Sequence, residues 1–436
     1  MSYFEIVRVV TDVLYFLLAA ILAHFSVFAA AGVFLKKTYP KTSKVNRYGV
    51  IIPARNEEAV VGALIDSIRA SDYPMDQLEI FVIAHNCTDS TATVARERKA
   101  TVYEYDNPSE NTMGFAFRYL FKCIERDRGT ASFDGFILLN ADNILAPDFI
   151  SRLNDAFVAC GGKSVITSFR NSKNFGTNLI SGLYGMYFAL LCRLDCRGRT
   201  ALGCSTRVQG TGYLINSDIV KNGWPYVSLT EDWEFTVDQI LFNNNIEYCD
   251  DAVFYDEQPT SVRIMWRQRV RWARGHLLVF YARFRDLVKS LFKKETRRRF
   301  SLYDITAYIL PSPFMMVMIQ ALQLILYATA PLFDPTVSFR RVMLGETANF
   351  LVSDGLLFIW ARSGIVSALV MMFTAALVFF LERRRIKGVS VFKRVLVTLC
   401  WPIFMAIQLP IDVQAVLSRN LGWKPIPHGD KSVPKG

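Results

Sequence analysis

One long apolar run dominates the start of the chain, and a cluster of positive charges follows it. Between Val13 and Leu35, the only strongly polar side chain is that of His24. At about 1.5 Å per residue, a helix of this length crosses a hydrocarbon core of about 30 Å. We therefore predict a membrane-spanning helix within residues 1–36. A cleaved signal peptide is the alternative, but the amino terminus lacks a positive leader and the run is too long.

From Tyr48 to about Tyr255, short runs rich in β-branched residues alternate with helical patterns. The predicted strands are Tyr48–Pro53, Leu78–Ala84, Thr101–Tyr105, Gly135–Asn140 and Ser164–Phe169. The predicted helices are Glu57–Ala70, Thr88–Ala100, Met113–Glu125 and Pro147–Ala159. This alternation predicts an α/β domain over residues 48–260, with a mostly parallel sheet and helices on both faces. Ligands of such sheets bind at the carboxyl ends of the strands. Residues 55–57, 85–89 and 142–143 should therefore share one edge.

Residues 261–303 are strongly basic. Between Ser261 and Arg299 there are thirteen Lys or Arg residues and two acids, a surplus that equals the net charge of +11 for all 436 residues. Arg and Trp recur at helical spacing, which predicts amphipathic helices on an anionic membrane surface. A solvated basic face is the alternative. The basic residues crowd beside hydrophobic segments without a nucleic-acid-binding motif, so we expect no nucleic acid partner.

Three further apolar segments lie within residues 304–418, namely 305–331, 363–381 and 395–411. The basic residues after the first helix and within residues 382–394 place the α/β domain in the cytosol by the positive-inside rule. These features predict a multi-pass protein of the plasma membrane. The third segment is short and contains Pro402 and Pro410. If it spans the membrane, the tail 419–436 lies outside. If it is re-entrant or interfacial, Trp423–Ile426 lies in the cytosol. The eight cysteines form neither a disulfide framework nor a zinc motif, and we expect reduced thiols.

Acidic residues mark candidate chemistry in the α/β domain. Asp142 follows a very apolar strand, where a carboxylate can reach a divalent cation that bridges phosphates. Asp89 lies at the predicted start of one helix, and the neighbouring residues Glu231 and Asp232 lie at the start of another, so helix capping is one interpretation for each of them. A carboxylate near a sheet edge can also take a proton from an attacking hydroxyl, which is the second interpretation for Glu231 and Asp232.

Four motifs occur in a distinctive order: Asp142, Thr230-Glu231-Asp232, the segment Tyr255–Pro259, and Gln268 with Arg271 and Trp272. In order and spacing they resemble the membrane-bound family 2 inverting glycosyltransferases, which include cellulose, hyaluronan, chitin and poly-N-acetylglucosamine synthases. The resemblance covers roughly residues 48–281. It implies a GT-A fold, a nucleotide-sugar donor such as a UDP-sugar, and Mg²⁺ or Mn²⁺ as the cofactor.

The resemblance also implies roles for individual residues. Asp142 matches the metal-binding Asp, and Asp232 the catalytic base, with Glu231 beside it. Gln268 and Arg271 match donor-binding residues, and Trp272 an acceptor-stacking residue, on an interfacial helix whose Met265 and Trp266 suit the bilayer boundary. The other implied donor-binding residues are Pro53, Ala54, Arg55, Asn56, Glu57, His85 and Asn140. The other implied acceptor-binding residues are Gly210, Thr211 and Gly212.

The sequence departs from the family pattern at three positions. His85 stands where an acidic residue usually faces the base, Asn140 replaces the first Asp of the DxD motif, and Met113-Gly114 replaces Lys-Gly. Each change removes a charge near the donor, but Asp142, Asp232 and Arg271 remain. We therefore expect an active enzyme that transfers a sugar, with inversion, to a saccharide or lipid-linked acceptor, either as a polymer or as a single addition. The alternative is a catalytically silent scaffold of a glycan-assembly complex.

Overall fold

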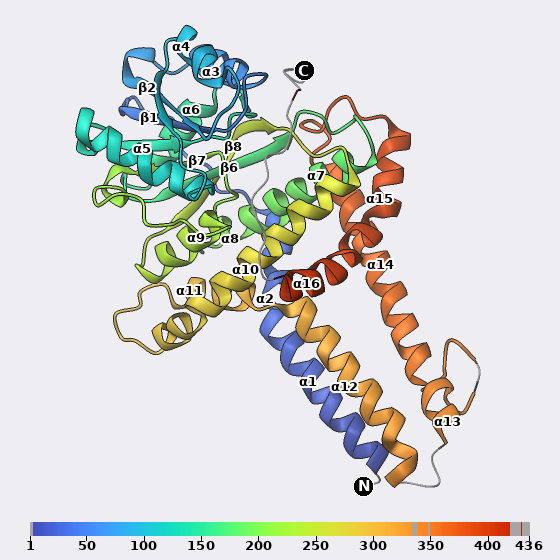
Figure 1. The fold of residues 1–436 in the computed structure, drawn as a ribbon. Coiled ribbons are helices and arrows are strands. Elements are labelled where there is room, and N and C mark those ends of the chain that lie inside the picture. The colour runs from blue at the N-terminus through green and yellow to red at the C-terminus, as the bar shows by residue number, and fades with distance from the viewer. Residues whose placement is uncertain (1–2, 334–337, 348, 419–428, 430–436) are drawn as a thin grey trace.

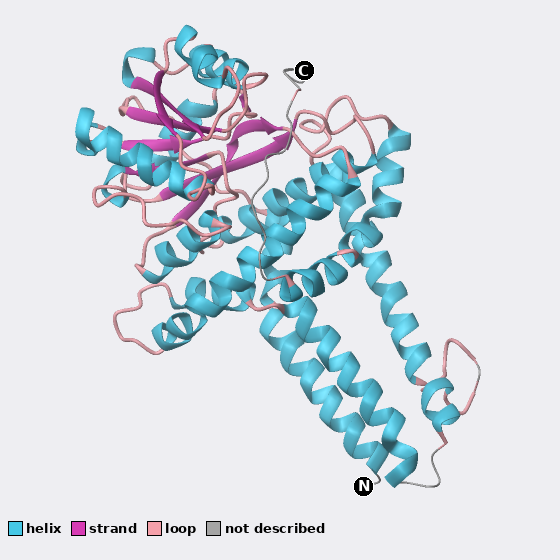
Figure 2. Ribbon diagram, viewed as in Figure 1, coloured by secondary structure: helices cyan, strands magenta, loops and turns pink. Residues whose placement is uncertain are grey.

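The computed structural model describes residues 3–333, 338–347, 349–418 and 429. An α/β domain lies at one end, and long helices extend away from it (Figure 1). Within the described residues, the strands all belong to the α/β end (Figure 2). The predicted tail, residues 419–436, falls outside the described residues except for Gly429.

The described part of the α/β domain has one sheet of eight strands, in the order β3-β2-β1-β4-β7-β6-β8-β5. Strand β1 is parallel to β2 and β4, β2 to β3, and β6 to β8. Strand β7 is antiparallel to β4 and β6, and β5 to β8. The strands are β1 Tyr48–Ala54, β2 Leu78–His85, β3 Thr101–Tyr105, β4 Gly135–Leu138, β5 Ile144–Leu145, β6 Val165–Ser172, β7 Tyr213–Asn216 and β8 Ile246–Asp256.

All five predicted strands are present, and the predicted α/β fold with helices is confirmed, with a mixed sheet. The strand predicted to Asn140 ends at Leu138, and the strand predicted to Phe169 continues to Ser172. Strands β5, β7 and β8 were not predicted. The first two are only 2 and 4 residues long, so they carry little periodic signal.

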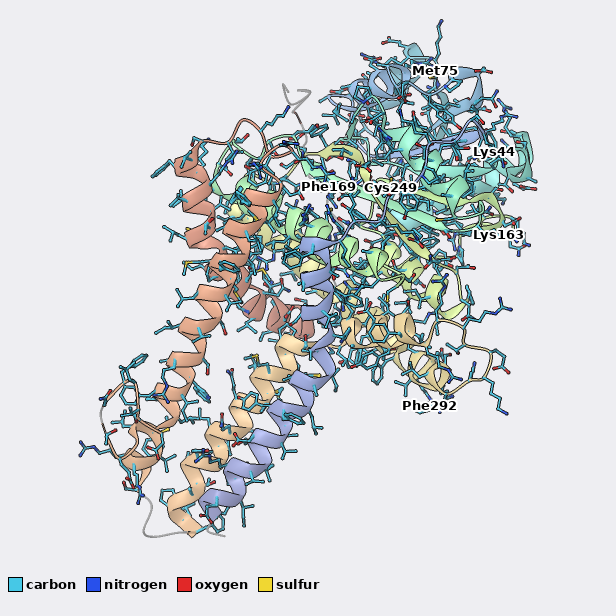
Figure 3. All side chains as sticks on the ribbon, turned by 180° about the vertical axis from the view of Figure 1, so that it is seen from behind. Lys44, Met75, Lys163, Phe169, Cys249 and Phe292 are labelled. Carbon is cyan, nitrogen blue, oxygen red and sulfur yellow. The ribbon has the colours of Figure 1, made fainter. Side chains whose placement is uncertain are left out.

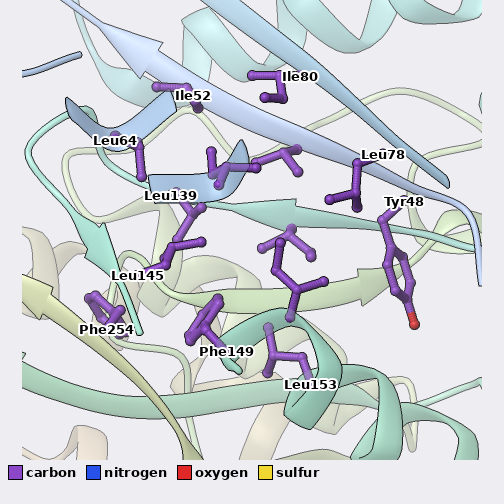
Figure 4. Close-up of a cluster of buried hydrophobic side chains, with 14 of the residues drawn as sticks. Tyr48, Ile52, Leu64, Leu78, Ile80, Leu139, Leu145, Phe149, Leu153 and Phe254 are labelled. Carbon is purple, nitrogen blue, oxygen red and sulfur yellow. The ribbon is translucent and has the colours of Figure 1, made fainter. Parts of the chain in front are cut away.

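Helices cover both faces of the sheet, which is why β1 and β2 are buried almost throughout. On one face, α3 (Val61–Arg69) and α6 (Phe149–Ala159) contribute Leu64 and Phe149 to one buried cluster with Ile52 of β1 (Figure 4). On the other face, α5 (Met113–Asp127) packs Phe121 against Trp224. Each such side chain stabilises the fold by about 1.5–3 kcal/mol relative to an exposed one. The sheet therefore holds its strand ends, and the loops that follow them, firmly in place.

A helix from residue 179 to 201 was not predicted. Helix α7 (Leu179–Leu190) continues through one π-helical segment (Leu191–Cys196) into α8 (Arg197–Ala201). The stretch is apolar enough to cross a membrane, yet it is 61% buried inside the fold. Tyr184 of α7 lies in one hydrophobic cluster with Phe379 and Trp401. The α/β domain and the carboxyl-terminal helices thus share a core.

Five helical stretches in the described residues are long and apolar enough to cross a membrane: Glu5–Phe34, Leu179–Ala201, Ser312–Phe333, Leu356–Leu381 and Val391–Leu417. The predicted first helix consists of α1 (Tyr3–Leu22) and α2 (His24–Phe34). Helix α12 (Ser312–Phe333) lies beside α1, and both extend away from the α/β domain with α14 (Leu356–Leu381) (Figures 1 and 3). A short helix, α13 (Phe339–Leu344), contacts both α12 and α14.

The apolar segment predicted over residues 395–411 is part of two helices. Helix α15 (Val391–Ala406) packs on α7 and α14, whereas α16 (Gln408–Leu417) packs on α12 and on the basic helix α10. Pro410 has no backbone N–H for the carbonyl of Ala406, four residues earlier, so the helix breaks between them. Between these two helices the chain therefore changes direction near the start of α12 (Figure 1).

The basic region forms helix α10 (Val262–Leu291), which is followed by α11 (Arg299–Ile309). Helix α10 contacts α9 (Glu231–Leu241). The expectation for Met265 is corrected here, because Met265 is only 1% exposed and packs in the cluster around Tyr184. Trp266 is half-buried, and its Nε1 donates to Gln414 Oε1 at 2.6 Å.

A buried carboxylate ties the α/β domain to three helical regions. Asp250 of β8 lies 3.6 Å from Lys36 Nζ, 3.3 Å from Arg197 Nη1 and 2.9 Å from Arg385 Nη2. The pKa of the Asp250 carboxyl is lowered, because the nearby guanidinium of Arg385 outweighs the cost of burial. Removing one of these cations would leave a buried charge with less compensation, which is strongly destabilising.

Candidate active site

A cavity of about 650 Å³ lies where the carboxyl ends of the strands face α10. Its wall includes all the predicted site residues except Asn56, Thr211 and Gly212. Those in the wall are Pro53, Ala54, Arg55, Glu57, His85, Asn140, Asp142, Gly210, Glu231, Asp232, Gln268, Arg271 and Trp272. The fold thus gathers residues that are more than two hundred positions apart in the sequence.

The loops after β1 and β2 are joined to each other by Asn56. This residue has a φ of +59°, and its Oδ1 accepts a hydrogen bond of 2.8 Å from the backbone N of Thr88. Asp89 accepts hydrogen bonds from the backbone N of Thr91 at 3.0 Å and of Glu58 at 3.1 Å. Asn56 and Asp89 therefore shape the loops, while Arg55 and Glu57 reach the cavity wall.

His85 closes the strand-end side of the cavity. Its side chain is 4% exposed, and Nε2 donates to the carbonyl oxygen of Glu110 at 2.6 Å. The imidazole is stacked on Tyr105, with 5.5 Å between ring centroids. Burial lowers the pKa of His85, so the ring is a neutral, flat surface at the cavity edge.

Asp142 belongs to a buried network that holds the loop after β4. Asn143 Nδ2 donates to Asp142 Oδ1 at 3.3 Å and to Asp256 Oδ1 at 2.8 Å. Thr211 donates its hydroxyl to Asn143 Oδ1 and accepts from the backbone N of Asn140 at 2.8 Å. Thr211 therefore positions this loop from behind. The cavity wall contains its neighbour Gly210 instead.

The residues at this loop suit a divalent cation that also binds phosphate. Asp142 and Glu257 both line the cavity, and the backbone N of Glu257 donates to Asp142 Oδ2 at 3.3 Å. Among the described residues, no three His, Cys, Asp or Glu side chains gather to form a complete metal site. Mg²⁺ in phosphate-binding sites commonly takes only one or two protein carboxylates and completes its shell with water and phosphate. A carboxylate pair of this kind fits that donor set.

Glu231 and Asp232 form the acidic part of the cavity at the start of α9. Burial and the neighbouring Asp232 raise the pKa of Glu231 to about 8, and burial also raises the pKa of Asp232. Arg271 acts in the opposite direction on both pKa values. A Cβ atom on Gly210 would lie 3.4 Å from Asp232 Oδ2, so the Gly210 backbone approaches this carboxylate closely.

Helix α10 directly contacts the loop that precedes α9. Arg271 Nη1 donates to the carbonyl oxygen of Leu229 at 2.7 Å. A Cβ atom on Gly275 would lie 2.3 Å from Thr230 Cγ2, which is closer than such atoms can approach, so only glycine fits here. Two buried oxygens in the cavity wall, Thr230 Oγ1 and Gln268 Oε1, make no hydrogen bond within the described chain. Buried polar atoms without partners are costly, which is consistent with a ligand that supplies them.

Other residues in the cavity were not assigned roles from the sequence. Arg170 pairs with Asp256 through Nε at 2.9 Å, and its Nη1 donates to the Gln209 carbonyl at 2.9 Å. Arg170 directly follows a predicted strand, so the strand-end rule could have identified it. The cavity also extends to Phe404, Gln408 and Asp412, for which the strand pattern gives no signal.

A mixed sheet with a ligand cavity at its strand ends is the architecture of the GT-A glycosyltransferases. The family model described as "Glycosyltransferase like family 2" matches residues 46–275, more than half of the chain. The chain therefore belongs to glycosyltransferase family 2, and the predicted family resemblance is confirmed.

Curated relatives carry two kinds of description. The β-monoglucosyldiacylglycerol synthase of Nostoc sp. is 26% identical over 279 residues, which cover 60% of this chain and 56% of the relative. The poly-β-1,6-N-acetyl-D-glucosamine synthase of Staphylococcus epidermidis is 21% identical over 259 residues, covering 57% and 58%. The matched part thus spans less than two thirds of these relatives' lengths.

A solved structure matches nearly the whole chain. The mannosyltransferase PcManGT from Pyrobaculum calidifontis, in complex with GDP-Man and Mn²⁺, superimposes with a TM-score of 0.55 at 14% identity. The match covers 92% of this chain and 99% of that chain. It confirms the GT-A-like fold with its accompanying helices.

Proposed function

We propose that the protein is an integral membrane enzyme that transfers a sugar, with inversion, from a nucleotide sugar to a saccharide or lipid-linked acceptor at the cytosolic face. The observation that carries this proposal is one cavity that joins Asp142 at a strand end, Asp232 at the start of α9 and Arg271 on α10. A UDP-sugar is the proposed donor, as the family resemblance implies, although His85 and Asn140 depart from the family pattern at the donor side.

The chain's own residues perform three tasks in this proposal. Asp232 accepts the proton of the acceptor hydroxyl, and its raised pKa makes it a better base than an ordinary carboxylate. Arg271 offers a planar, charged donor group to the departing diphosphate. Trp272 presents an aromatic face to the acceptor. Asp142, with Glu257 beside it, would hold Mg²⁺ or Mn²⁺, which when bound neutralises charge on the diphosphate.

The relatives support both kinds of product and a divalent metal. One relative is described as a glycolipid synthase, a second as a polysaccharide synthase, and the solved neighbour holds GDP-Man and Mn²⁺. For this chain, the division proposed is a membrane helix to residue 36, the catalytic domain 48–260, interface helices 261–303 and a membrane region 304–418. Residues 423–426, for which the sequence left a location outside the cell or in the cytosol open, are not among the described residues.

The proposal is tested with purified full-length protein in phospholipid nanodiscs. Radiolabelled nucleotide sugars are supplied with Mg²⁺ or Mn²⁺, and both donor hydrolysis and transfer are measured. Asp232→Asn should reduce transfer by about 10²–10⁴-fold, as expected for the loss of a general base. Asp218→Asn is the matched control, because Asp218 is exposed and outside the cavity. Absence of both activities with every donor would instead support the silent scaffold.

A further inference from the structure

The cavity does not end at the residues that the family motifs identify. It continues between α15, α16 and the start of α12, where its wall is mainly apolar. The apolar lining there comes from Leu310, Pro313, Phe314, Phe404, Met405 and Val416. Helix α12 begins at Ser312 and is one of the helices long and apolar enough to span a membrane. The cavity lining therefore runs from Asp232 to the first turn of α12.

Three polar side chains interrupt this apolar wall. Arg269 is 6% exposed and donates to Gln408 Oε1 from Nε at 3.1 Å and from Nη2 at 2.8 Å. Its Nη1 donates to the carbonyl oxygen of Phe404 at 2.9 Å. Gln408 Nε2 then donates to Asp412 Oδ1 at 2.6 Å. These bonds fix the orientation of Gln408 and present the Asp412 carboxylate at the cavity wall.

The arrangement differs from an ordinary structural ion pair. Gln408 stands between Arg269 and Asp412, and no salt bridge to Asp412 occurs among the described residues. An acid in an apolar segment is costly, and such residues commonly serve ligands. Each of the three guanidinium nitrogens of Arg269 donates to a protein oxygen, which fixes Arg269 in place, and the Asp412 carboxylate is the acceptor that this triad presents at the cavity wall. A carboxylate accepts hydrogen bonds from hydroxyls and repels phosphate.

We propose that this arm binds the acceptor, and that the acceptor is an uncharged membrane lipid with several free hydroxyls, such as a glycosylated glycerolipid. The lipid tail lies against the apolar wall, one head hydroxyl donates to Asp412, and a second head hydroxyl is the attacking group. This proposal rests on the proposed glycosyltransferase function. The acceptor oxygen forms the bond to the anomeric carbon, the bond from that carbon to the diphosphate breaks with its electron pair, and the proton passes to Asp232.

The test uses the full chain in nanodiscs that contain monoglucosyldiacylglycerol, polyprenyl phosphate or neither, with a soluble oligosaccharide as a third acceptor. Wild-type protein should transfer sugar to monoglucosyldiacylglycerol in preference to the other two. Asp412→Asn should raise the KM for monoglucosyldiacylglycerol by about tenfold or more, which corresponds to losing a hydrogen bond to a charged group. It should also lower the ratio of lipid transfer to donor hydrolysis.

Two further variants test the same proposal, one by filling the apolar arm and one as a control. Met405→Trp fills the apolar arm without changing its charge, and it should likewise lower the ratio of lipid transfer to donor hydrolysis. Asp12→Asn is the matched control, since Asp12 is an acid in α1, outside the cavity, with a 64% exposed side chain. It should leave both activities unchanged.

Several results would overturn the proposal. Preference of the wild type for polyprenyl phosphate or for the soluble oligosaccharide would assign a different acceptor class. An unchanged KM for monoglucosyldiacylglycerol in Asp412→Asn would remove Asp412 from the acceptor site. In both cases donor hydrolysis and transfer would persist, so the glycosyltransferase function would stand. Loss of donor hydrolysis and of transfer in the wild type would contradict both proposals.

Discussion

The two walls of the cavity are built by different means. On one wall, His85 and Asp142 follow strands whose register is fixed by backbone hydrogen bonds within one sheet. On the other wall, Arg271 and Gln268 lie on a helix that is held by contacts to α9, α11 and α16. A strand-end residue keeps its place through local geometry, whereas a helix-wall residue depends on packing between distant segments. Substitutions on the first wall should therefore alter chemistry alone, and those on the second should alter chemistry and position together.

The largest effect is expected at the strand-end wall. Asp142→Asn keeps the side-chain shape but removes the charge, so transfer should fall by about 10²–10³-fold, as for the loss of one preorganised electrostatic contact. The unfolding midpoint should stay close to that of wild type. Transfer rates measured across a Mn²⁺ titration check this. Near-normal turnover with the same metal dependence would remove Asp142 from the site.

Arg271→Lys tests the helix wall with its charge retained. Lysine cannot form the planar pair of hydrogen bonds and loses the bond to the Leu229 carbonyl, so turnover should fall by about 100-fold. Arg263→Lys, at an exposed position on the same helix, is the control and should behave as wild type. If Arg271→Lys also kept wild-type turnover, the assigned role would be wrong.

Gly275→Ala tests whether packing alone positions the helix wall. The added methyl group would collide with Thr230, so α10 and the loop that precedes α9 must separate. A displacement of about 1 Å can cost about 100-fold in rate, and we expect a loss of about 10–100-fold in kcat. The comparison is Gly364→Ala on α14, where nothing lies within 4 Å of the new methyl group. Equal kcat values for Gly275→Ala and Gly364→Ala would show that the contact between α10 and Thr230 accommodates the added methyl group.

The dependence of transfer on pH should reveal the acidic pair. Because burial raises the pKa of Asp232 and raises that of Glu231 to about 8, the base is protonated at pH values where an ordinary carboxyl is charged. Transfer should therefore increase with pH into the neutral range. Arg271 lowers both pKa values, so in Arg271→Gln this rise should move to higher pH. Profiles of kcat/KM against pH for both proteins measure the shift.

The same raised pKa values affect stability with a definite sign. A carboxyl whose pKa is higher in the folded state favours folding below its ordinary pKa. That contribution is lost as pH rises through the raised pKa, which is about 8 for Glu231. Thermal unfolding midpoints of wild type should therefore fall more steeply in this range than those of Glu231→Gln. Parallel curves for the two proteins would contradict the burial argument.

The smallest effect is expected at His85. His85→Asp places a charge beside the cavity edge while the β2 strand stays intact, so donor preference should change by only several-fold in KM, about 1 kcal/mol. Competition between UDP-sugars and GDP-sugars measures this. An unchanged preference would identify His85 as a structural histidine at the end of β2 that holds the Glu110 backbone.

The comparison of the two walls also explains what the sequence could predict. The alternation of strands and helices located His85, Asn140 and Asp142, because each lies at or just after the carboxyl end of a strand that the apolar pattern predicts. Thr211 and Asn56 are outside the cavity wall, although the sequence predicted them in the site. Their side chains instead hydrogen bond to neighbouring loops, Asn56 to the loop after β2 and Thr211 to the loop after β4. The contact of Arg269 with Gln408 joins residues 139 positions apart on two helices, and no local pattern encodes it. The burial of residues 179–201 likewise depends on α14 and α15, so its hydrophobicity alone resembles that of a membrane segment.

The cluster around Asp250 sets an order of events in time. Its three cations, Lys36, Arg197 and Arg385, are synthesised in that order. The α/β domain leaves the ribosome before Arg385 exists, so this buried carboxylate still lacks one partner at that stage. The turn after α14 must then dock on β8 before the charge is fully neutralised. The buried charge of β8 is thus fully compensated only after α14 has been made.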